Sequence, residues 1–278
     1  MPITGLENTP TRVYQNFLYT LDMTSSLMQK YEYYCMYRAE KSLWWYKGLR
    51  DILEYYLAQK GQKLRMLDAG CGTGMNIKFL LSKGHLAYGI DLSTDAIALC
   101  KKRRLKTVKK GSILNLPFRN NSFDALICID VLGSMTSDRN IEKALRGFYR
   151  ILKPNGILLI HCAALPWLRS PHDVVTNFRV RFSKDELLSY IPISRWNIIK
   201  CSYRVFFLFP IVASIKLIKK FIWNVTGDKT DQNVTPQILN RAFFFIQFIE
   251  NRILRFIDFP IGSSLILIAE KNYVSRKK

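Results

Sequence analysis

A glycine-rich turn between an apolar strand and an amphipathic helix constrains this chain more than any other feature. Residues 67–74 read LDAGCGTG, follow a short apolar run and precede a helical pattern that includes Ile77. Such a strand–turn–helix unit directs backbone N–H groups and a helix N-terminus at whatever lies above it. Gly70, Gly72 and Gly74 lack the Cβ atoms that would keep a ligand away from the backbone. We therefore predict a nucleotide-like ligand at this turn.

The spacing of the glycines narrows the kind of nucleotide. They follow the pattern G-x-G-x-G, whereas dinucleotide sites use G-x-G-x-x-G. A second predicted strand covers residues 86–90, and Asp91 stands at its carboxyl end, where an acidic side chain can accept hydrogen bonds from ribose hydroxyls. The context fits a nucleoside site, and the loop argues against NAD.

Together with Asp68, which precedes the glycines, these residues resemble motif I of the class I methyltransferases. The resemblance implies that the cofactor is S-adenosyl-L-methionine. Backbone groups around Gly70 and Gly72 are expected to hold its amino acid tail, while Asp68 orients the turn or reaches the ammonium through water. Asp91 is expected to accept from both ribose hydroxyls, with Leu92 beside it in the same site.

The ends of the third and fourth predicted strands extend this site. Ser112 stands where such enzymes commonly carry an Asp that accepts from the adenine amine, and Ile113 would pack on the adenine face; an ordinary loop is the alternative. Asp130 follows the fourth strand and should border the transferred methyl group. It would hold an amine acceptor or a wall of the site, or else cap a helix.

The chain has three histidines, and one of them stands where an acceptor would arrive. His172 lies in the loop after the fifth strand, so it is a candidate general base or acceptor contact, against a plain loop hydrogen bond. Asp173 is expected to orient His172 or to cap a turn. His85 precedes the second strand and His161 lies inside the fifth, so both are poorer candidates.

Alternating apolar runs and helical patterns predict an α/β fold: a Rossmann-like, seven-stranded, mostly parallel sheet with helices on both faces. The chain is divided into an N-terminal helical lid region (1–60), a methyltransferase core (61–204), a hydrophobic helical insertion before the last strand (205–260), and the last strand with a basic tail (261–278). The predicted strands cover residues 65–69, 86–90, 107–111, 123–130, 156–163, 196–204 and 263–270.

Charge and cysteine content bound the partners. The formal net charge is +21, and a basic run over residues 101–110 is read either as a solvated helix end away from the ligand turn or as a patch for RNA or an anionic membrane. Six cysteines without a C-x-x-C pair indicate a reduced cytoplasmic interior and no metal site. The first residues lack the pattern of a signal peptide, so we expect a cytoplasmic location. Peripheral contact with the inner face of the membrane is compatible with this expectation.

The insertion at 205–260 differs in character from the core. In its first half, Ile211, Ile215, Ile218 and Ile222 form one stripe, and Lys216, Lys219 and Lys220 another. Its second half is apolar nearly all round. Neither half offers the ~20 uncharged apolar residues that a bilayer crossing needs. Three interpretations stay open: a cap over an apolar acceptor pocket, a surface lying in a membrane interface, or a homodimer contact.

Over residues 64–164 the chain resembles a type 11 class I methyltransferase, and beyond them a bacterial subgroup often encoded beside glycosyltransferases. The subgroup pattern H-W-W-F-x-G-R-R corresponds to residues 43–50, LWWYKGLR. Its D-V-L-E-H motif appears as DVLGS at 130–134, and half of its later polar set, near His172, is replaced. These departures lie on the expected acceptor side.

Methyl transfer is an in-line displacement, so such a site mainly aligns its acceptor and excludes water. We expect an O- or N-methyltransferase acting on an apolar small molecule, a specialised metabolite or a lipid-linked acceptor. An RNA methyltransferase is the alternative suggested by the +21 charge. Nucleic acid is nevertheless the less expected partner, because the segment after the fourth strand, IDVL at 129–132, is not a catalytic N-P-P-Y-like motif.

Overall fold

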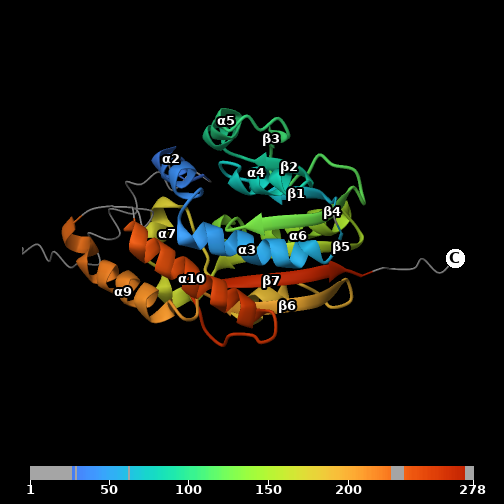
Figure 1. Cartoon of the computed structure of the whole chain (residues 1–278). Helices are drawn as coiled ribbons and strands as arrows, with labels where there is room; N and C mark the ends of the chain where they lie inside the picture. The colour runs from blue at the N-terminus through green and yellow to red at the C-terminus, as the bar shows by residue number, and fades with distance from the viewer. Residues whose placement is uncertain (1–26, 29, 62, 227–234, 273–278) are drawn as a thin grey trace, which may run out of the picture.

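The computed structural model describes residues 27–28, 30–61, 63–226 and 235–272. They form a three-layer α/β fold around one twisted sheet (Figure 1). Its strands, in chain order, are β1 Arg65–Ala69, β2 Leu86–Asp91, β3 Val108–Lys110, β4 Phe123–Ile129, β5 Leu152–Ala163, β6 Trp196–Arg204 and β7 Ser264–Lys271. The seven predicted strands are thus confirmed, with β3 shorter and β5 longer than expected.

The strands lie in the order β3-β2-β1-β4-β5-β7-β6. The first five are parallel to their neighbours, and β7 runs antiparallel between β5 and β6. Because β7 pairs Ser264 with both Ala163 and Arg204, the carboxyl ends of β5 and β6 meet the start of β7 at one edge. The β6–β7 connection therefore leaves and re-enters the sheet at the edge where β1 and β4 also end.

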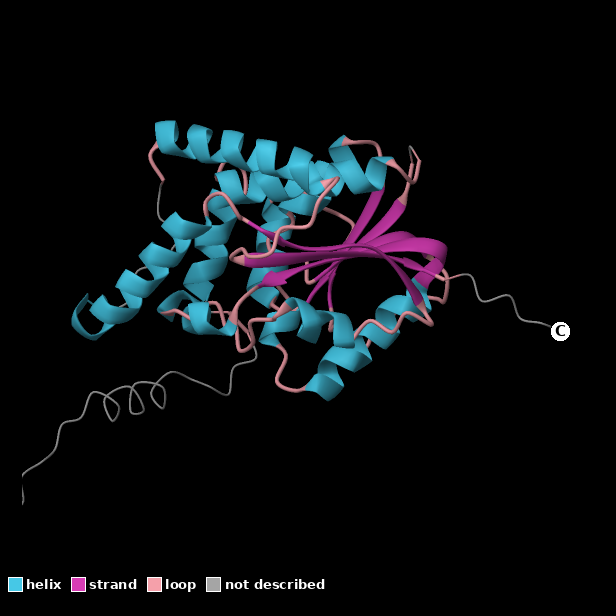
Figure 2. Ribbon diagram, turned by 90° about the horizontal axis from the view of Figure 1, so that it is seen from below, coloured by secondary structure: helices cyan, strands magenta, loops and turns pink. Residues whose placement is uncertain are grey.

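Helices cover both faces of the sheet (Figure 2). Their bounds are α2 Lys30–Ala39, α3 Trp44–Ala58, α4 Met75–Ser82, α5 Thr94–Lys102, α6 Asp138–Ile151, α7 Pro171–Val175, α8 Lys184–Ser189, α9 Phe209–Thr226 and α10 Gln237–Leu254. Alternate strand residues enter two separate cores. Leu158 and Ile160 of β5 share a core with Phe148 of α6, whereas Leu159 shares the other with Ile52 of α3.

The predicted helical lid region contains two helices with different surroundings. Leu49, Ile52 and Leu53 of α3 are fully buried, so this helix is a layer of the core. In contrast, α2 contacts α5 and lies over the carboxyl edge of the sheet. Residues 1–26 and 29 of the predicted region lie outside the described residues.

The insertion contains the two predicted helices, α9 and α10. Helix α10 packs along α3, and α9 contacts α7 and the turn Pro166–Leu168. Among the helices that the structure describes, none combines the length and the apolar character that a bilayer span requires.

Candidate active site

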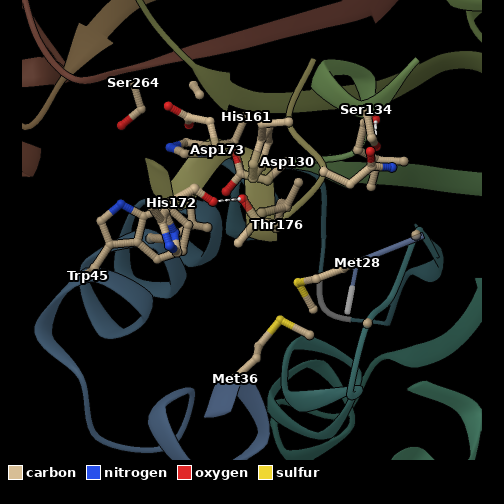
Figure 3. A pocket seen from close by; sticks show the side chains of 18 of the residues that line it. Met28, Met36, Trp45, Asp130, Ser134, His161, His172, Asp173, Thr176 and Ser264 are labelled. Carbon is tan, nitrogen blue, oxygen red and sulfur yellow. Dashed lines mark hydrogen bonds and ion pairs between the residues drawn. The ribbon is translucent and has the colours of Figure 1, made fainter. Parts of the chain in front are cut away.

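A cavity of about 720 Å³ opens at the carboxyl edge of the sheet (Figure 3). Eight of the predicted site residues line it: Gly70, Gly72, Asp91, Leu92, Ser112, Ile113, Asp130 and His172. Residues from α2, α3, α9 and α10 complete its walls, which makes the lining predominantly apolar. The structure therefore brings most of the predicted site together and adds walls from both flanking helical regions.

The glycine turn has the backbone that its sequence demands. Gly70, Gly72 and Gly74 have φ values of 85°, 50° and 84°, a region that side chains with a Cβ rarely adopt. A Cβ on Gly70 would lie 2.2 Å from the Val131 side chain, and one on Gly72 would lie 2.8 Å from Met36 Cε. The turn consequently remains a cradle bounded by Val131 and by the α2 helix.

Gly74 lies beneath this cradle and does not line the cavity. It precedes α4, and a Cβ there would lie 2.5 Å from Leu105 and 2.8 Å from Cys100 Sγ. We expected all three glycines to face the ligand. A glycine is instead required at position 74 because α4 packs closely against α5 and the loop after it.

Asp91 joins the end of β2 to the glycine turn. Its Oδ2 accepts the Gly72 N–H at 2.8 Å, and its Oδ1 accepts the Ser93 N–H at 2.9 Å. Burial raises the pKa of Asp91, and these backbone hydrogen bonds oppose the rise. A carboxylate can accept about four hydrogen bonds and Asp91 lines the cavity, so it can both fix the turn and accept from a ligand hydroxyl.

Asp68 is 1% exposed and lies below the turn, outside the cavity lining. Neither of its oxygens accepts a hydrogen bond of normal geometry from the described residues, although the nearby Asn76 side chain lowers its pKa slightly. Burial, with the charges of Glu40 and Asp91, raises the pKa of Asp68 to about 8. A buried carboxyl without partners is suited to a cationic group above it.

Ser112 and Ile113 lie on the loop after β3 and line the cavity. Ser112 Oγ accepts the Leu114 N–H at 3.2 Å, so part of its role is to hold the loop. Ile113 is 6% exposed and joins the core under β1 and β4. Both positions retain their predicted place beside the cofactor cradle.

Asp130 and His161 form a pair at the cavity floor that the sequence reading did not identify. The register of β4 and β5 places Ile129 opposite His161, and the Asp130 Oδ1 lies 3.0 Å from His161 Nδ1. Asp130 has a left-handed backbone with φ of 56°, held by a hydrogen bond from its N–H to the His161 carbonyl. Trp45 packs edge-on against the imidazole at 5.2 Å.

The two side chains of this pair differ in exposure. His161 is 1% exposed and Asp130 is 23% exposed, while both line the cavity. His161 Nε2 is buried without a hydrogen-bond partner among the described residues. With Nδ1 oriented by the carboxylate, Nε2 is left as the ring nitrogen that can accept a proton.

His172 also lines the cavity, from the short helix α7 (Figure 3). Asp173 caps that helix by accepting the Ser170 N–H at 2.6 Å, and it binds Arg181 through both oxygens, at 2.7 and 3.1 Å. Burial would raise the pKa of Asp173, but the hydrogen bonds and charge of Arg181 lower it overall. Asp173 thus holds the position of α7, as one of its expected roles requires.

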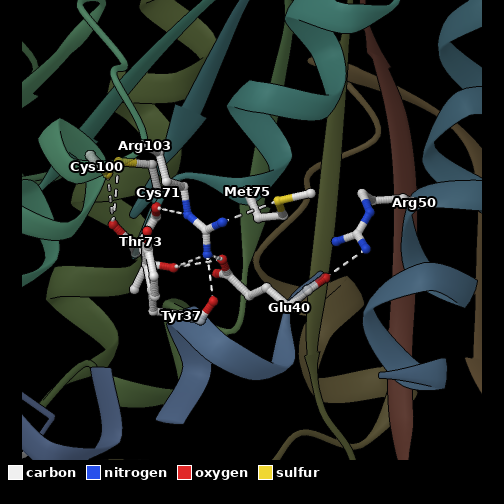
Figure 4. Close-up of polar contacts among 9 residues, drawn as sticks. Tyr37, Glu40, Arg50, Cys71, Thr73, Met75, Cys100 and Arg103 are labelled. Atoms are coloured by element: carbon white, nitrogen blue, oxygen red, sulfur yellow. Dashed lines mark hydrogen bonds and ion pairs between the residues drawn. The ribbon is translucent and has the colours of Figure 1, made fainter. Parts of the chain in front are cut away.

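Arg103 fastens α2 to the glycine turn (Figure 4). Its guanidinium donates to the Thr73 carbonyl at 2.9 Å, to the Tyr37 carbonyl at 2.8 Å and to Glu40 Oε2 at 2.9 Å. Glu40 also accepts from the Thr73 hydroxyl at 2.5 Å, and burial raises its pKa to about 7. The basic run at 101–110 was expected to lie away from the ligand turn, and Arg103 corrects that expectation.

The residues of the cradle fit S-adenosylmethionine. Side-chain-free positions at Gly70 and Gly72, the acceptor Asp91 and the partnerless buried carboxyl of Asp68 match the tail, ribose and ammonium of that molecule in kind. Comparison with known protein families gives the same indication: residues 67–160 match the family model described as a methyltransferase domain.

Curated relatives match over a similar number of residues. A tRNA (carboxymethyluridine(34)-5-O)-methyltransferase from Arabidopsis thaliana is 34% identical over 96 residues, which are 34% of this chain and 23% of that protein. A malonyl-[acyl-carrier protein] O-methyltransferase from Pectobacterium atrosepticum is 32% identical over 96 residues, 34% of this chain and 37% of that protein. The chain thus spans well under half the length of the curated relatives that it matches.

Among solved structures, a SAM-dependent methyltransferase from Thermotoga maritima, described as a possible histamine N-methyltransferase, has a TM-score of 0.52 at 16% identity. The match covers 87% of this chain and 95% of that one, and it shows a shared fold. Together, the sheet order, the cradle and the family match make residues 67–160 a class I methyltransferase domain with S-adenosylmethionine as its cofactor.

Proposed function

We propose that the whole chain transfers a methyl group from S-adenosylmethionine to an oxygen or nitrogen of an apolar small molecule or lipid-linked acceptor. The cavity carries this proposal: about 720 Å³ beside the cradle, walled by Ile211, Val212 and Ile215 of α9 and by Phe243 of α10. An apolar enclosure of that size suits an apolar acceptor and excludes water from the displacement.

Bound S-adenosylmethionine supplies an activated methyl group, so the protein has to align the acceptor and manage one proton. The Asp130–His161 pair is the group suited to that proton. Asp130 holds Nδ1 of His161, and Nε2 takes the proton of an acceptor hydroxyl as the new bond to carbon forms. His172, which lines the same cavity, contacts the acceptor in this proposal.

Some residues that resemble the bacterial subgroup encoded beside glycosyltransferases lie on the acceptor side of the cavity. Trp44, Trp45 and Tyr46, which match the subgroup pattern, line the cavity together with His172. We include membership of that subgroup in the proposal, with a lipid-linked acceptor as the compound class. The six free cysteines fit work in a reducing, cytoplasmic compartment.

An RNA acceptor is the second candidate, favoured by the net charge of +21 and by the tRNA methyltransferase among the matched relatives. The apolar walls of the cavity favour the lipid-like acceptor over it. An RNA substrate would instead require bases to enter a cavity whose outer wall is built from isoleucine and phenylalanine.

One assay separates the two candidates. Purified protein is incubated with methyl-labelled S-adenosylmethionine and either a total lipid extract or total tRNA of the source organism. We expect label in the organic phase and none in acid-precipitable RNA. Label in RNA alone would reject the apolar acceptor, whereas failure to bind S-adenosylhomocysteine by calorimetry would reject methyl transfer altogether.

A further inference from the structure

The outward face of α10 carries large apolar side chains where a solvated helix carries polar ones. Ile238, Phe245 and Ile249 follow one another at spacings of seven and four, and Phe256 continues the stripe beyond the helix end. Ile238, Phe245 and Phe256 are 82%, 63% and 85% exposed, and Ile249 is 40% exposed. A contiguous exposed apolar stripe of this kind is unusual in a monomeric protein and typically marks an interaction surface.

The polar face of α10 points inward. Gln247, Glu250 and Asn251 are fully buried, and Glu250 accepts the Val205 N–H at 2.6 Å and the Gln247 amide at 2.7 Å. Beneath them Arg204 is fully buried, and its pKa is lowered by burial and partly restored by Glu250. The orientation of α10 is therefore fixed by its polar face, which leaves the apolar stripe outside.

Helix α9 repeats the arrangement. Ile211, Ile215 and Ile218 lie at helical spacing and are 46%, 47% and 54% exposed. Ile211 and Ile215 also line the cavity, so the exposed stripe of α9 is continuous with the cavity wall. Both helices emerge from the same edge of the sheet (Figure 1).

The exposed charges beside the stripe of α10 are basic. The sequence of α9 contains no Asp or Glu, and Glu250 of α10 is buried. Asp258, which follows Phe256, is paired with two lysines. Arg241 and Arg252 are exposed. We propose that this lipid face, defined as the exposed apolar stripes of α9 and α10 with these two arginines, binds the surface of an anionic lipid bilayer.

Charge complementarity selects this occupant over a second copy of the chain. In a two-fold dimer the same face would meet itself and bring Arg241 and Arg252 toward their own copies. A bilayer surface supplies acyl chains for the stripes and negative headgroups for the cations. Lys216 is excluded from the lipid face because its ammonium donates to Ser170 Oγ at 3.1 Å.

The test is flotation of the full chain with vesicles of phosphatidylcholine alone and of phosphatidylcholine with phosphatidylglycerol. We expect binding to the anionic vesicles and its loss at high salt. The double variant Arg241→Ala, Arg252→Ala should bind roughly 25-fold more weakly, since each basic residue contributes about fivefold near such a surface.

A matched control removes the same charge elsewhere. Lys101 and Arg104 are exposed around the end of α5, at the far side of the molecule from α9 and α10 (Figure 1). Their replacement by Ala should reduce binding much less than the double variant of the lipid face does. Unchanged affinity for S-adenosylhomocysteine in every variant shows that the fold and the cofactor site are intact.

A second variant tests the apolar stripe. Ile238→Ser, Phe245→Ser, Phe256→Ser should abolish flotation with the anionic vesicles, whereas Ile193→Ser, at a site 80% exposed before β6, should not. Absence of vesicle binding by the parent chain overturns the proposal. So does a parent dimer that becomes monomeric in the apolar variant, because the face would then be a contact between copies. Neither result touches the proposed methyl transfer.

Discussion

Asp130 and His161 meet because two parallel strands end at the same height. Strand periodicity alone places His161 in the interior of β5, so its chemistry depends on a register that one sequence does not specify. The strained φ of Asp130 is the independent sign of function at this spot.

We predict that His161→Gln lowers methyl-transfer turnover by about 10²- to 10⁴-fold, since that is the usual contribution of general base catalysis. His172→Ala should instead raise KM for the acceptor and leave kcat nearly unchanged. If His172→Ala lowers kcat by that factor and His161→Gln does not, the base is His172.

Asp91 serves both the turn and the ligand. Asp91→Ala should weaken binding of S-adenosylhomocysteine by about 1–3 kcal/mol, because contacts to ribose hydroxyls and the hydrogen bonds to Gly72 and Ser93 are lost together. Titration calorimetry measures the change. Equal affinities of the variant and the parent would remove Asp91 from the cofactor site.

Asp68 makes stability fall as pH rises. Its folded pKa of about 8 exceeds the ordinary value of 3.8, so the folded chain retains a proton that the unfolded chain releases. The contribution is complete below about pH 4 and is lost as the pH passes about 8. Asp68→Asn should therefore lose less Tm than the parent between about pH 5 and about pH 9. The remaining slope reports Glu40 and Asp91, whose pKa values are also raised. An identical slope in Asp68→Asn would contradict the assignment.

Helix α2 is held to the core chiefly by one ion pair. Arg103 and Glu40 are both 8% exposed, and the Tyr37 ring lies 4.0 Å from the guanidinium. The helix is otherwise amphipathic only weakly, with Tyr31 and Tyr34 exposed. The docking of this helix over the cradle consequently depends on charge at least as much as on apolar burial.

Arg103→Met should destabilise the protein by about 3–5 kcal/mol, because it leaves the carboxylate of Glu40 buried alone. Hydrogen exchange across Lys30–Ala39 should accelerate more than elsewhere. Glu40→Gln should cost less, since a neutral side chain still accepts from Thr73. As a control, Arg146→Met breaks the exposed pair with Glu142 and should cost below about 1 kcal/mol. Equal costs for Arg103→Met and Arg146→Met would show that the buried pair contributes nothing special.

For the molecule as a whole, the sequence predicted the sheet well because its signals are local. Leu158, Ile160 and Cys162 alternate with Ile157 and Leu159, and the glycines at 70 and 72 mark the only turn that such spacing allows. Contacts between residues far apart in the chain could not be predicted from the sequence. Arg103 and Glu40 are 63 residues apart. The polar face of α10 is buried because it packs over the buried Arg204, which the sequence of α10 alone does not indicate.

The net charge of +21 gives the whole molecule an affinity for polyanions that is not a sign of its substrate. We predict that tRNA binds at low salt and that its affinity falls about a thousandfold or more toward physiological salt, as counterion release requires. Filter binding across a salt series measures this. Tight, salt-resistant binding to one tRNA would support the RNA acceptor instead.

The position of residues 205–260 between two neighbouring strands makes this segment exchangeable as a unit. The segment leaves β6 and returns at β7, whereas the cradle belongs to β1 and β2 on the other half of the sheet. The part of the proposed acceptor cavity that α9 and α10 build is therefore encoded apart from the cradle. We expect a chimera that exchanges the segment between Arg204 and Ser264 to change acceptor preference while its affinity for S-adenosylhomocysteine stays the same.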